Sequence, residues 1–345
     1  MNTSLAPLSA VQNVGRRYPD IWNQIDEVRE IGREFGYQWD DNICYCPIVT
    51  AIGALNSRQG LPKNVATGLG AYVAACAMWR REKRVYRFDP DLANEVIATA
   101  DDLVIPAEIL YQMPSSCMYL QFPQTSGSPS IDGFFAWVEI DPENKRRELR
   151  IMYLDADGEP VTQYIVHLIP GGTINDGIDA AIKEIRRNAD SASPEILERL
   201  IAFHSESRKY TVEAVQLILY ACAANADMRE NEEQKRVYKP GAKVVDKFRE
   251  VRKWDVGDRI GEQIRIIRGK KPGTHEHDET ERAATGPRQY KNRPHVRRAH
   301  WAHYHVGEGR TKLVLKWINT IFVNAEDGEV GVTVQMVEKE KEKSE

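Results

Sequence analysis

Residues 133–168 read GFFAWVEIDPENKRRELRIMYLDADGEPVTQYIVHL, with apolar runs separated by short, turn-rich links. The runs at 133–140, 148–154 and 161–168 are rich in β-branched and aromatic residues, which favours strands. A similar run, SSCMYLQF, occupies 115–122. Links as short as DPENK and DADGEP suit antiparallel neighbours, because parallel strands need a crossover of roughly a dozen residues. The pattern therefore predicts an antiparallel β-meander.

Helical patterns lie on both sides of this meander. Residues 19–35 carry apolar side chains at helical spacing and predict an amphipathic helix. Residues 65–79 contain no charged side chain and predict a buried helix. Further helices are expected at 176–187, 194–203 and 211–224. We therefore expect an α+β fold, in which helices pack on the antiparallel meander and a smaller basic α+β module follows at the C-terminal end.

Charge is distributed unevenly along the 345 residues, whose formal net charge is -4. Residues 235–317 contain 22 Lys and Arg against 10 Asp and Glu, a net of +12, which leaves -16 on the rest. Within 282–317 there are nine basic residues and one acidic residue, Glu308. A basic segment joined to an acidic body suggests a polyanionic partner or an acidic peptide.

Composition and charge together predict three parts. Residues 1–233 form an α+β body with the meander, residues 234–325 form a basic recognition module rich in His, Arg and Trp, and residues 326–345 form a charged tail. Within the module, residues 269–286 have almost no large apolar side chain and predict a loop.

The compartment expected is the cytoplasm. The beginning of the chain, MNTSLAPLSA, lacks the basic and apolar regions of a signal peptide, and no uncharged apolar run reaches the roughly 18 residues that span a bilayer. The cysteines form no CxxC pair, and we find no nucleotide-binding or cofactor motif. We therefore expect no membrane partner and no cofactor.

The densest cluster of functional residue types is 293–310, RPHVRRAHWAHYHVGEGR. One interpretation is a zinc site, in which His300, His303 and His305 converge with His275 or His277. Structural zinc sites usually recruit thiolates, and no Cys lies in this region, so we predict no metal.

A second interpretation is metal-independent RNA cleavage. One imidazole would take the 2′-hydroxyl proton, another would protonate the leaving oxygen, and a cationic side chain would stabilise the charged phosphorane. The catalytic candidates are His295, His300, His303 and His305.

The favoured interpretation is recognition without chemistry. Arg and Lys pair with phosphates or carboxylates, and aromatic rings stack on bases or peptide side chains. The binding residues predicted are Arg293, His295, Arg297, Arg298, His300, Trp301, Tyr304, Arg310, Lys312, Lys316 and Trp317. A purely structural role, with His and Trp in a small core, stays open.

The run RPHVRRAHWAHYHVG, followed by WINTIFVN at 317–324, resembles the large type V-A anti-CRISPR proteins of phages and plasmids, in particular the second-named family of that class. The local resemblance covers about 291–324. The signature positions that it implies are Arg293, Pro294, His295, Arg297, Arg298, His300, Trp301 and Tyr304, followed by Gly307, Gly309 and Arg310. His305 and the Gly-Glu-Gly at 307–309 depart from the usual pattern, which leaves the role of His305 open.

The resemblance implies a regulator carried by a mobile genetic element in a bacterial host cell. A binding protein is the favoured class, and the question of enzyme activity stays open, with a ribonuclease as the alternative. Such a protein suppresses biogenesis of the type V-A effector nuclease by recognising its nascent N-terminal peptide or its message, and the mRNA is then lost. The expected partners are that peptide or mRNA, with the ribosome and a host ribonuclease beside them. The alternative is an endoribonuclease or RNA-binding protein that uses the C-terminal His/Arg cluster.

Overall fold

The computed structural model describes residues 5–37, 40–59, 63–99, 105–121, 131–140, 145–188, 194–231, 251–269, 295–297, 299–318 and 321–323. In these ranges the helices are α1 (Ala6–Arg17), α2 (Ile21–Glu34), α3 (Ile48–Gln59), α4 (Lys63–Glu82), α5 (Pro90–Ile97), the 3-10 helix η1 (Ala107–Gln112), α6 (Ile174–Asn188), α7 (Pro194–Cys222) and α8 (Asp258–Gly269). The main sheet contains β1 (Arg84–Phe88), β2 (Cys117–Gln121), β3 (Ile131–Ile140), β4 (Arg147–Asp155), β5 (Pro160–His167), β6 (Met228–Glu230) and β7 (Arg252–Val256).

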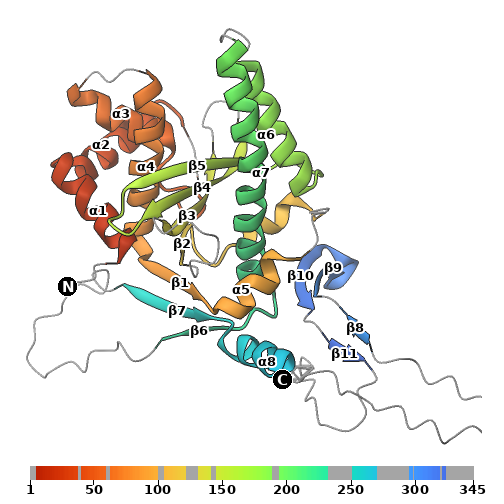
Figure 1. Ribbon diagram of the computed structural model, residues 1–345. Helices are drawn as coiled ribbons and strands as arrows, with labels where there is room; N and C mark the ends of the chain where they lie inside the picture. The colour runs from red at the N-terminus through yellow and green to blue at the C-terminus, as the bar shows by residue number, and fades with distance from the viewer. Residues whose placement is uncertain are drawn as a thin grey trace, which may run out of the picture.

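The α+β class is confirmed, and the sheet is larger than the predicted meander. Its seven strands have the order β5-β4-β3-β2-β1-β7-β6. Strands β2 to β5 are antiparallel neighbours, as the short links predict. Strand β1 instead pairs in parallel with both β2 and β7, so the sheet as a whole is mixed. Figure 1 shows this sheet between a group of helices, α1 to α4, on one face and α6 and α7 on the other.

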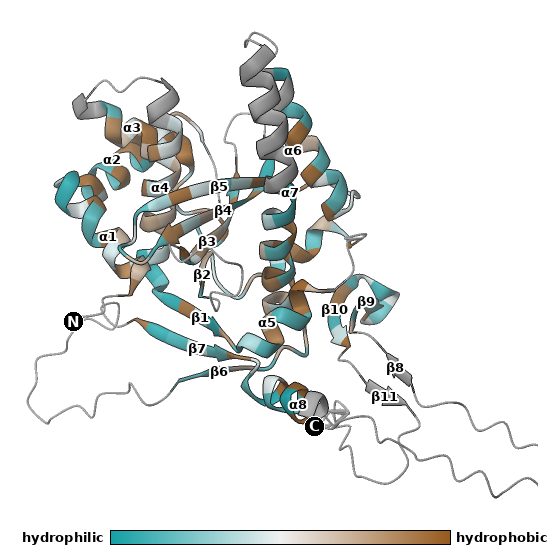
Figure 2. Ribbon diagram, in the orientation of Figure 1, coloured by the Kyte–Doolittle hydropathy of each residue, from teal (hydrophilic) through white to brown (hydrophobic). Residues whose placement is uncertain are grey.

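Strand β3 is buried on both faces of the sheet. Phe134 packs into the core beneath α5 to α7, whereas its neighbour Phe135 packs into the core beneath α1 to α4. Trp137 joins the second core and Val138 the first. A strand covered on both faces needs apolar residues at consecutive positions, which is why FFAWV does not alternate with polar residues. In Figure 2 the hydrophilic colour gathers instead on β6 and β7, at the β6 edge of the sheet.

Helix α4 is the buried helix that the uncharged run predicts. All residues at 71–79 are buried, with Trp79 donating from its Nε1 to the carbonyl of Arg84 at 2.8 Å. Gly70 lets α4 approach α3, because a Cβ at this position would lie 2.5 Å from Cγ1 of Ile52. The Ala and Gly content of this run therefore serves close helix packing.

The second half of the chain differs from expectation in two places. The predicted helices 194–203 and 211–224 are one continuous helix, α7, because the polar residues between them include neither Gly nor Pro. Residues 252–256, from the predicted C-terminal module, form β7 inside the main sheet. The boundary near 233 stays a prediction, and the predicted loop at 269–286 and tail at 326–345 lie almost wholly outside the described residues. Among the helices described here, none is long and apolar enough to span a membrane.

Candidate recognition surface

The cluster at 293–310 folds as part of an antiparallel hairpin. Strands β9 (His300–Val306) and β10 (Lys312–Ile318) pair throughout, and the short pair β8 (His295–Arg297) and β11 (Ile321–Val323) continues beyond them. The turn contains η4 (Glu308–Arg310), where Gly307 and Gly309 have φ values of 85° and 67°. Glycine adopts such angles at low cost, which accounts for the Gly-Glu-Gly sequence.

Alternation along the strands divides the hairpin into two faces. Residues paired across an antiparallel ladder share a face. The outer face carries His300, Ala302, Tyr304 and Val306 with Ile318, Lys316, Val314 and Lys312. The inner face carries Trp301, His303 and His305 with Trp317, Leu315 and Leu313. The cluster that looks continuous in the sequence is therefore split between two surfaces.

The inner face anchors the hairpin to the body. The rings of Trp301 and Trp317 meet edge to face with centroids 4.7 Å apart, and Trp317 also meets Tyr220 of α7 at 6.2 Å. The Nε1 of Trp301 donates to Oε1 of Gln216 at 2.5 Å, and Gln216 is fully buried. Trp317 is only 2% exposed. In this structure its ring belongs to the core, so the structural role left open by the sequence applies to Trp317.

The edge of β10 is also attached to the body. Asn225 donates from Nδ2 to the carbonyl of Trp317 at 2.7 Å and accepts the N–H of Trp317 on Oδ1 at 2.9 Å. The N–H of Ala224 donates to the carbonyl of Leu315 at 2.9 Å, and Gln112 donates to the carbonyl of Leu313 at 3.0 Å. Figure 1 accordingly shows β10 beside α7 and β9 on the outside.

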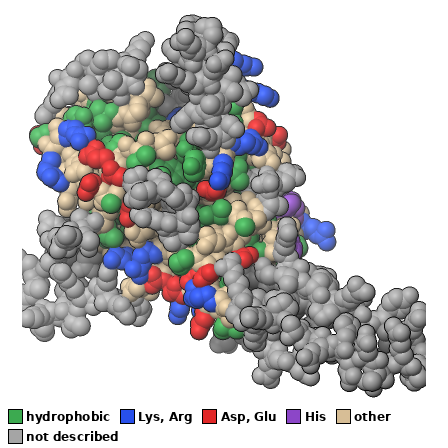
Figure 3. Space-filling view, in the orientation of Figure 1, with side chains coloured by type: hydrophobic (Ala, Val, Ile, Leu, Met, Phe, Trp, Pro, Cys, Tyr) green, Lys and Arg blue, Asp and Glu red, His purple; other side chains and the backbone are tan. Residues whose placement is uncertain are grey.

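The outer face is available to a partner. Tyr304 is 48% exposed, and the Nζ of Lys316 lies 6.0 Å from the centroid of its ring. Lys312 and Arg310 are exposed at the turn end of the hairpin. Figure 3 shows histidine and basic side chains together at the surface on this side of the molecule. A ring beside ammonium and guanidinium groups can bind carboxylates, phosphates or stacked planar groups.

The histidines do not form one group. His300 lies on the outer face, whereas His303 and His305 lie on the inner face and are exposed because β9 is farther from the body than β10. A proton donor and acceptor acting on one phosphate need to converge, so among the described imidazoles only His303 and His305 are placed as a pair.

Several predicted residues lie outside this description. Arg293, Pro294 and Arg298 are not among the described residues, and His295 and Arg297 are described only by their place in β8. His275 and His277 are also outside, and within the described residues no group of His, Cys, Asp or Glu is arranged to hold a metal ion. The binding roles of all these residues stay predictions.

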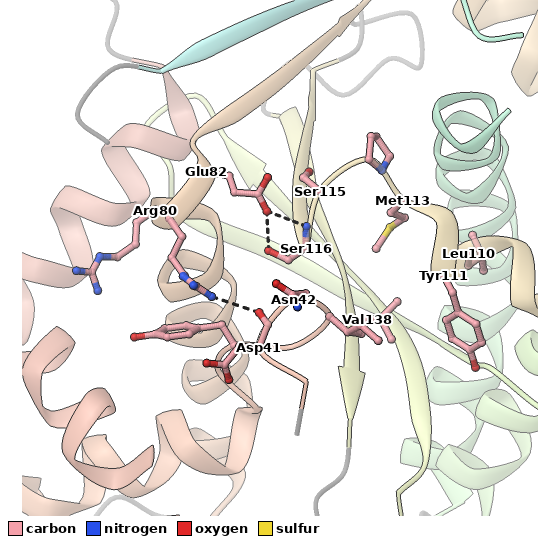
Figure 4. A pocket seen from close by; sticks show the side chains of 14 residues that line it. Asp41, Asn42, Arg80, Glu82, Leu110, Tyr111, Met113, Ser115, Ser116 and Val138 are labelled. Carbon is pink, nitrogen blue, oxygen red and sulfur yellow. Dashed lines mark hydrogen bonds between the residues drawn. The ribbon is translucent and has the colours of Figure 1, made fainter. Parts of the chain in front are cut away.

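A pocket of about 800 Å³ lies elsewhere, at the end of α4. Figure 4 shows the end of α4 with Asp41 and Asn42 on one side, and Tyr111 and Met113 on the other. Four segments of the sequence form it, including Val138 of β3, and no local motif marks any of them, so the sequence pattern does not indicate it.

Glu82 and Arg81, which line this pocket, already have partners in the protein. Oε1 of Glu82 accepts from the N–H and Oγ of Ser116 at 3.1 and 3.0 Å. Arg81 donates to the carbonyl of Asp41 at 3.2 Å and lies over the ring of Tyr45 at 4.2 Å. Burial, with a hydrogen bond to Asp26, raises the pKa of Tyr45 to about 12, so the phenol stays neutral. The pocket is thus lined by both polar and apolar side chains, and Glu82 and Arg81 in it are held by bonds within the protein.

One buried carboxylate connects the sheet to the N-terminal helices. Glu139 of β3 accepts the N–H of Ile48 at 2.8 Å, at the first residue of α3, and the Nε1 of Trp137 at 3.1 Å. Burial raises its pKa to about 7, although both hydrogen bonds favour the charged form. Glu139 thus changes charge near neutral pH inside the protein.

Known proteins resemble this chain in sequence and in fold. Residues 86–325 match the AcrVA2-like family model, described as the anti-CRISPR type V subtype A2 family. Protein FinQ of Escherichia coli is 26% identical over 275 residues, which span 72% of this chain and 75% of that protein. The crystal structure of AcrVA2 is similar with a TM-score of 0.60 and 14% identity, over 93% of this chain and 100% of that chain. At that identity the structural likeness shows the fold alone.

Proposed function

The chain belongs to the AcrVA2-like anti-CRISPR type V subtype A2 family, and on that premise we propose that it lowers the amount of the type V-A effector nuclease by acting on its synthesis. In this proposal the protein is encoded on a mobile genetic element and works in the bacterial cytoplasm. It recognises the nascent N-terminal peptide of the effector, or its message, and the mRNA is then lost.

The observation that supports this proposal most is the outer face of the β9–β10 hairpin. It combines Tyr304, 48% exposed, with Lys316 and Lys312, while the inner face is held against α7 by Trp301 and Trp317. A rigid platform lowers the entropy lost on binding, which favours recognition of a flexible chain.

The charge distribution supports a place of action beside the ribosome. The net charge of +12 over 235–317 favours a partner rich in phosphate or carboxylate. The charge of -16 on the remaining residues repels bulk RNA and so limits indiscriminate binding. The ribosome and a host ribonuclease are therefore the further partners that we propose.

Recoding the effector gene tests this function. The effector is expressed in bacteria with and without the protein, and effector mRNA and protein are measured. The first codons are then changed either synonymously or so that the peptide changes. Rescue by the amino-acid change alone supports peptide recognition, and rescue by the synonymous change supports recognition of the message. An effector level that never responds contradicts the proposal.

The alternative function, RNA cleavage, is favoured by one observation: His303 and His305 are both exposed on the inner face of β9. Purified protein is incubated with effector mRNA for this test. Cleavage that is lost in His303→Gln and His305→Gln, with RNA binding retained, supports an enzyme. Intact RNA after incubation with the wild-type protein excludes it.

A further inference from the structure

The backbone of the β10 edge of the β9–β10 hairpin is hydrogen-bonded to the body, whereas among the described residues that of the β9 edge is not. In an antiparallel ladder, the N–H and C=O of each residue point either toward the partner strand or away from it. Two residues that are paired across the ladder have the same orientation: both point toward each other's strand, or both point away. The carbonyls of Leu313, Leu315 and Trp317 accept from the body, so the backbone groups of these three residues point away from β9.

The opposite edge follows from the register. Leu313, Leu315 and Trp317 pair with residues 305, 303 and 301, whose N–H and C=O groups must therefore point away from β10. Within the described part of the chain, no backbone hydrogen bond uses these groups of Trp301, His303 or His305. Among the described residues, the edge of β9 thus presents a row of alternating donors and acceptors without a backbone partner.

An open strand edge of this kind is a template for another strand, and proteins usually protect it with proline, a bulge or a covering segment. Strand β9, HWAHYHV, contains no proline, and its register with β10 runs without a bulge from His300 to Val306. The edge is also held in place, because β10 is hydrogen-bonded to the body and the rings of the inner face are packed.

The side chains beside the edge indicate what would bind there. On the outer face the edge is next to Tyr304, with Lys316 behind it, and on the inner face it is next to His303 and His305. Near the turn, Lys312 and Arg310 outweigh the single carboxylate of Glu308. This charge complements a peptide that carries carboxylates, whereas a nucleic acid backbone has no N–H and C=O pattern to match a strand edge.

We propose that the edge of β9 at residues 301–305 binds an extended, carboxylate-containing peptide as an added β-strand. This inference rests on the proposed function and deepens it, because the occupant is then the nascent N-terminal segment of the effector. Main-chain hydrogen bonds supply affinity in such complexes, and alternate side chains of the peptide supply specificity by facing Tyr304 on one side and His303 on the other. A chain leaving the ribosome is extended and unpaired, as strand addition requires.

Amide hydrogen exchange tests the proposal, with a synthetic peptide of the effector's first residues as the probe. On addition of the peptide, the amides of His303 and His305 should slow by about tenfold or more, because they gain an acceptor. The amides of Ala302 and Tyr304, which already point toward β10, should change little. Protection of the hairpin edge supports strand addition.

A proline substitution gives a second readout. His303→Pro removes an N–H that faces away from β10, so the hairpin can retain its ladder, as the exchange of the β10 amides will show. We expect His303→Pro to weaken peptide binding about tenfold or more, and His303→Ala to weaken it less, because only the first removes a donor. N-methylation of alternate peptide amides should weaken binding in the same way.

The outcomes separate this inference from the proposed function. A peptide that binds while the His303 and His305 amides stay unprotected overturns strand addition and leaves peptide recognition intact. A peptide that does not bind, with effector mRNA binding instead, overturns both strand addition and peptide recognition. Equal binding by His303→Pro and the wild-type protein also overturns strand addition.

Discussion

Trp301 and Trp317 stand opposite each other in the register of β9 and β10, and their rings meet edge to face 4.7 Å apart, between centroids, on the surface of α7. One ring is tied to Gln216 by a hydrogen bond and the other packs against Tyr220. This pair attaches the hairpin to the body. Because its rings are buried on the inner face, Tyr304 is exposed and Lys316 is half-buried on the outer face.

Removal of the anchor should cost stability. Trp317→Ala deletes a fully packed ring, and we expect a loss of about 3–5 kcal/mol in the free energy of unfolding. Trp301→Phe keeps a ring but leaves Oε1 of buried Gln216 without its donor, which should cost about 1–3 kcal/mol. Urea unfolding measures both values. Tyr304→Ala is the control on the opposite face and should stay within about 0.5 kcal/mol of the wild type.

The backbone attachment of β10 can be tested separately. Asn225→Ala removes the donor to the carbonyl of Trp317 and the acceptor for its N–H, and we expect a loss of about 1–3 kcal/mol. The hydrogen exchange of β10 should rise more than that of β3. Uniform exchange across both strands would mean that the hairpin is not a separately docked element.

Side chains on the outer face of the hairpin should contribute to repression of the effector but not to the stability of the fold. Tyr304→Ala combined with Lys316→Ala should reduce repression of the effector about tenfold or more, because the ring and the cation act in one place. Lys209→Ala on α7 is the matched control, since it removes the same charge from a side chain that is 73% exposed and distant from the hairpin in the sequence. Effector mRNA at equal levels of each variant gives the measurement.

Glu139 should make stability depend on pH. Burial raises its pKa in the folded protein to about 7 from an ordinary value of 4.5, so the folded state holds this proton more tightly than the unfolded state. The stabilisation is therefore complete below about pH 4.5 and is lost as pH rises through about 7. Relative to Glu139→Gln, the wild type should lose on the order of 3 kcal/mol between pH 5 and pH 8. Parallel stability curves for the two proteins would contradict this role.

Local sequence patterns predict the single helices and the neighbouring strands of this fold. The strands at 133–168 follow from short apolar runs and short links, and the buried helix at 65–79 follows from its lack of charge. The parallel pairing of β1 with β7 joins residues 84–88 to residues 252–256, and no turn or spacing near either segment indicates it. Pairings between distant segments have no local signal.

In the candidate site, too, local features can be predicted from the sequence and contacts between distant segments cannot. The density of His, Arg and aromatic residues directs attention to the hairpin, but it treats the residues as one cluster. The alternation in HWAHYHV already separates Trp301 from Tyr304, provided that the segment is assumed to be a strand. Which of the two faces meets α7 depends on Gln216 and Tyr220, about a hundred residues earlier, and only the structure brings them together.

The most direct test of the central claim is effector mRNA in cells that express either the wild-type protein or the Tyr304→Ala, Lys316→Ala variant at equal levels. The outer face of the hairpin is proposed to recognise the product or message of the effector gene. We predict low effector mRNA with the wild-type protein, and recovery to the level of cells without it when the variant is expressed. Equal repression by both proteins would contradict the claim.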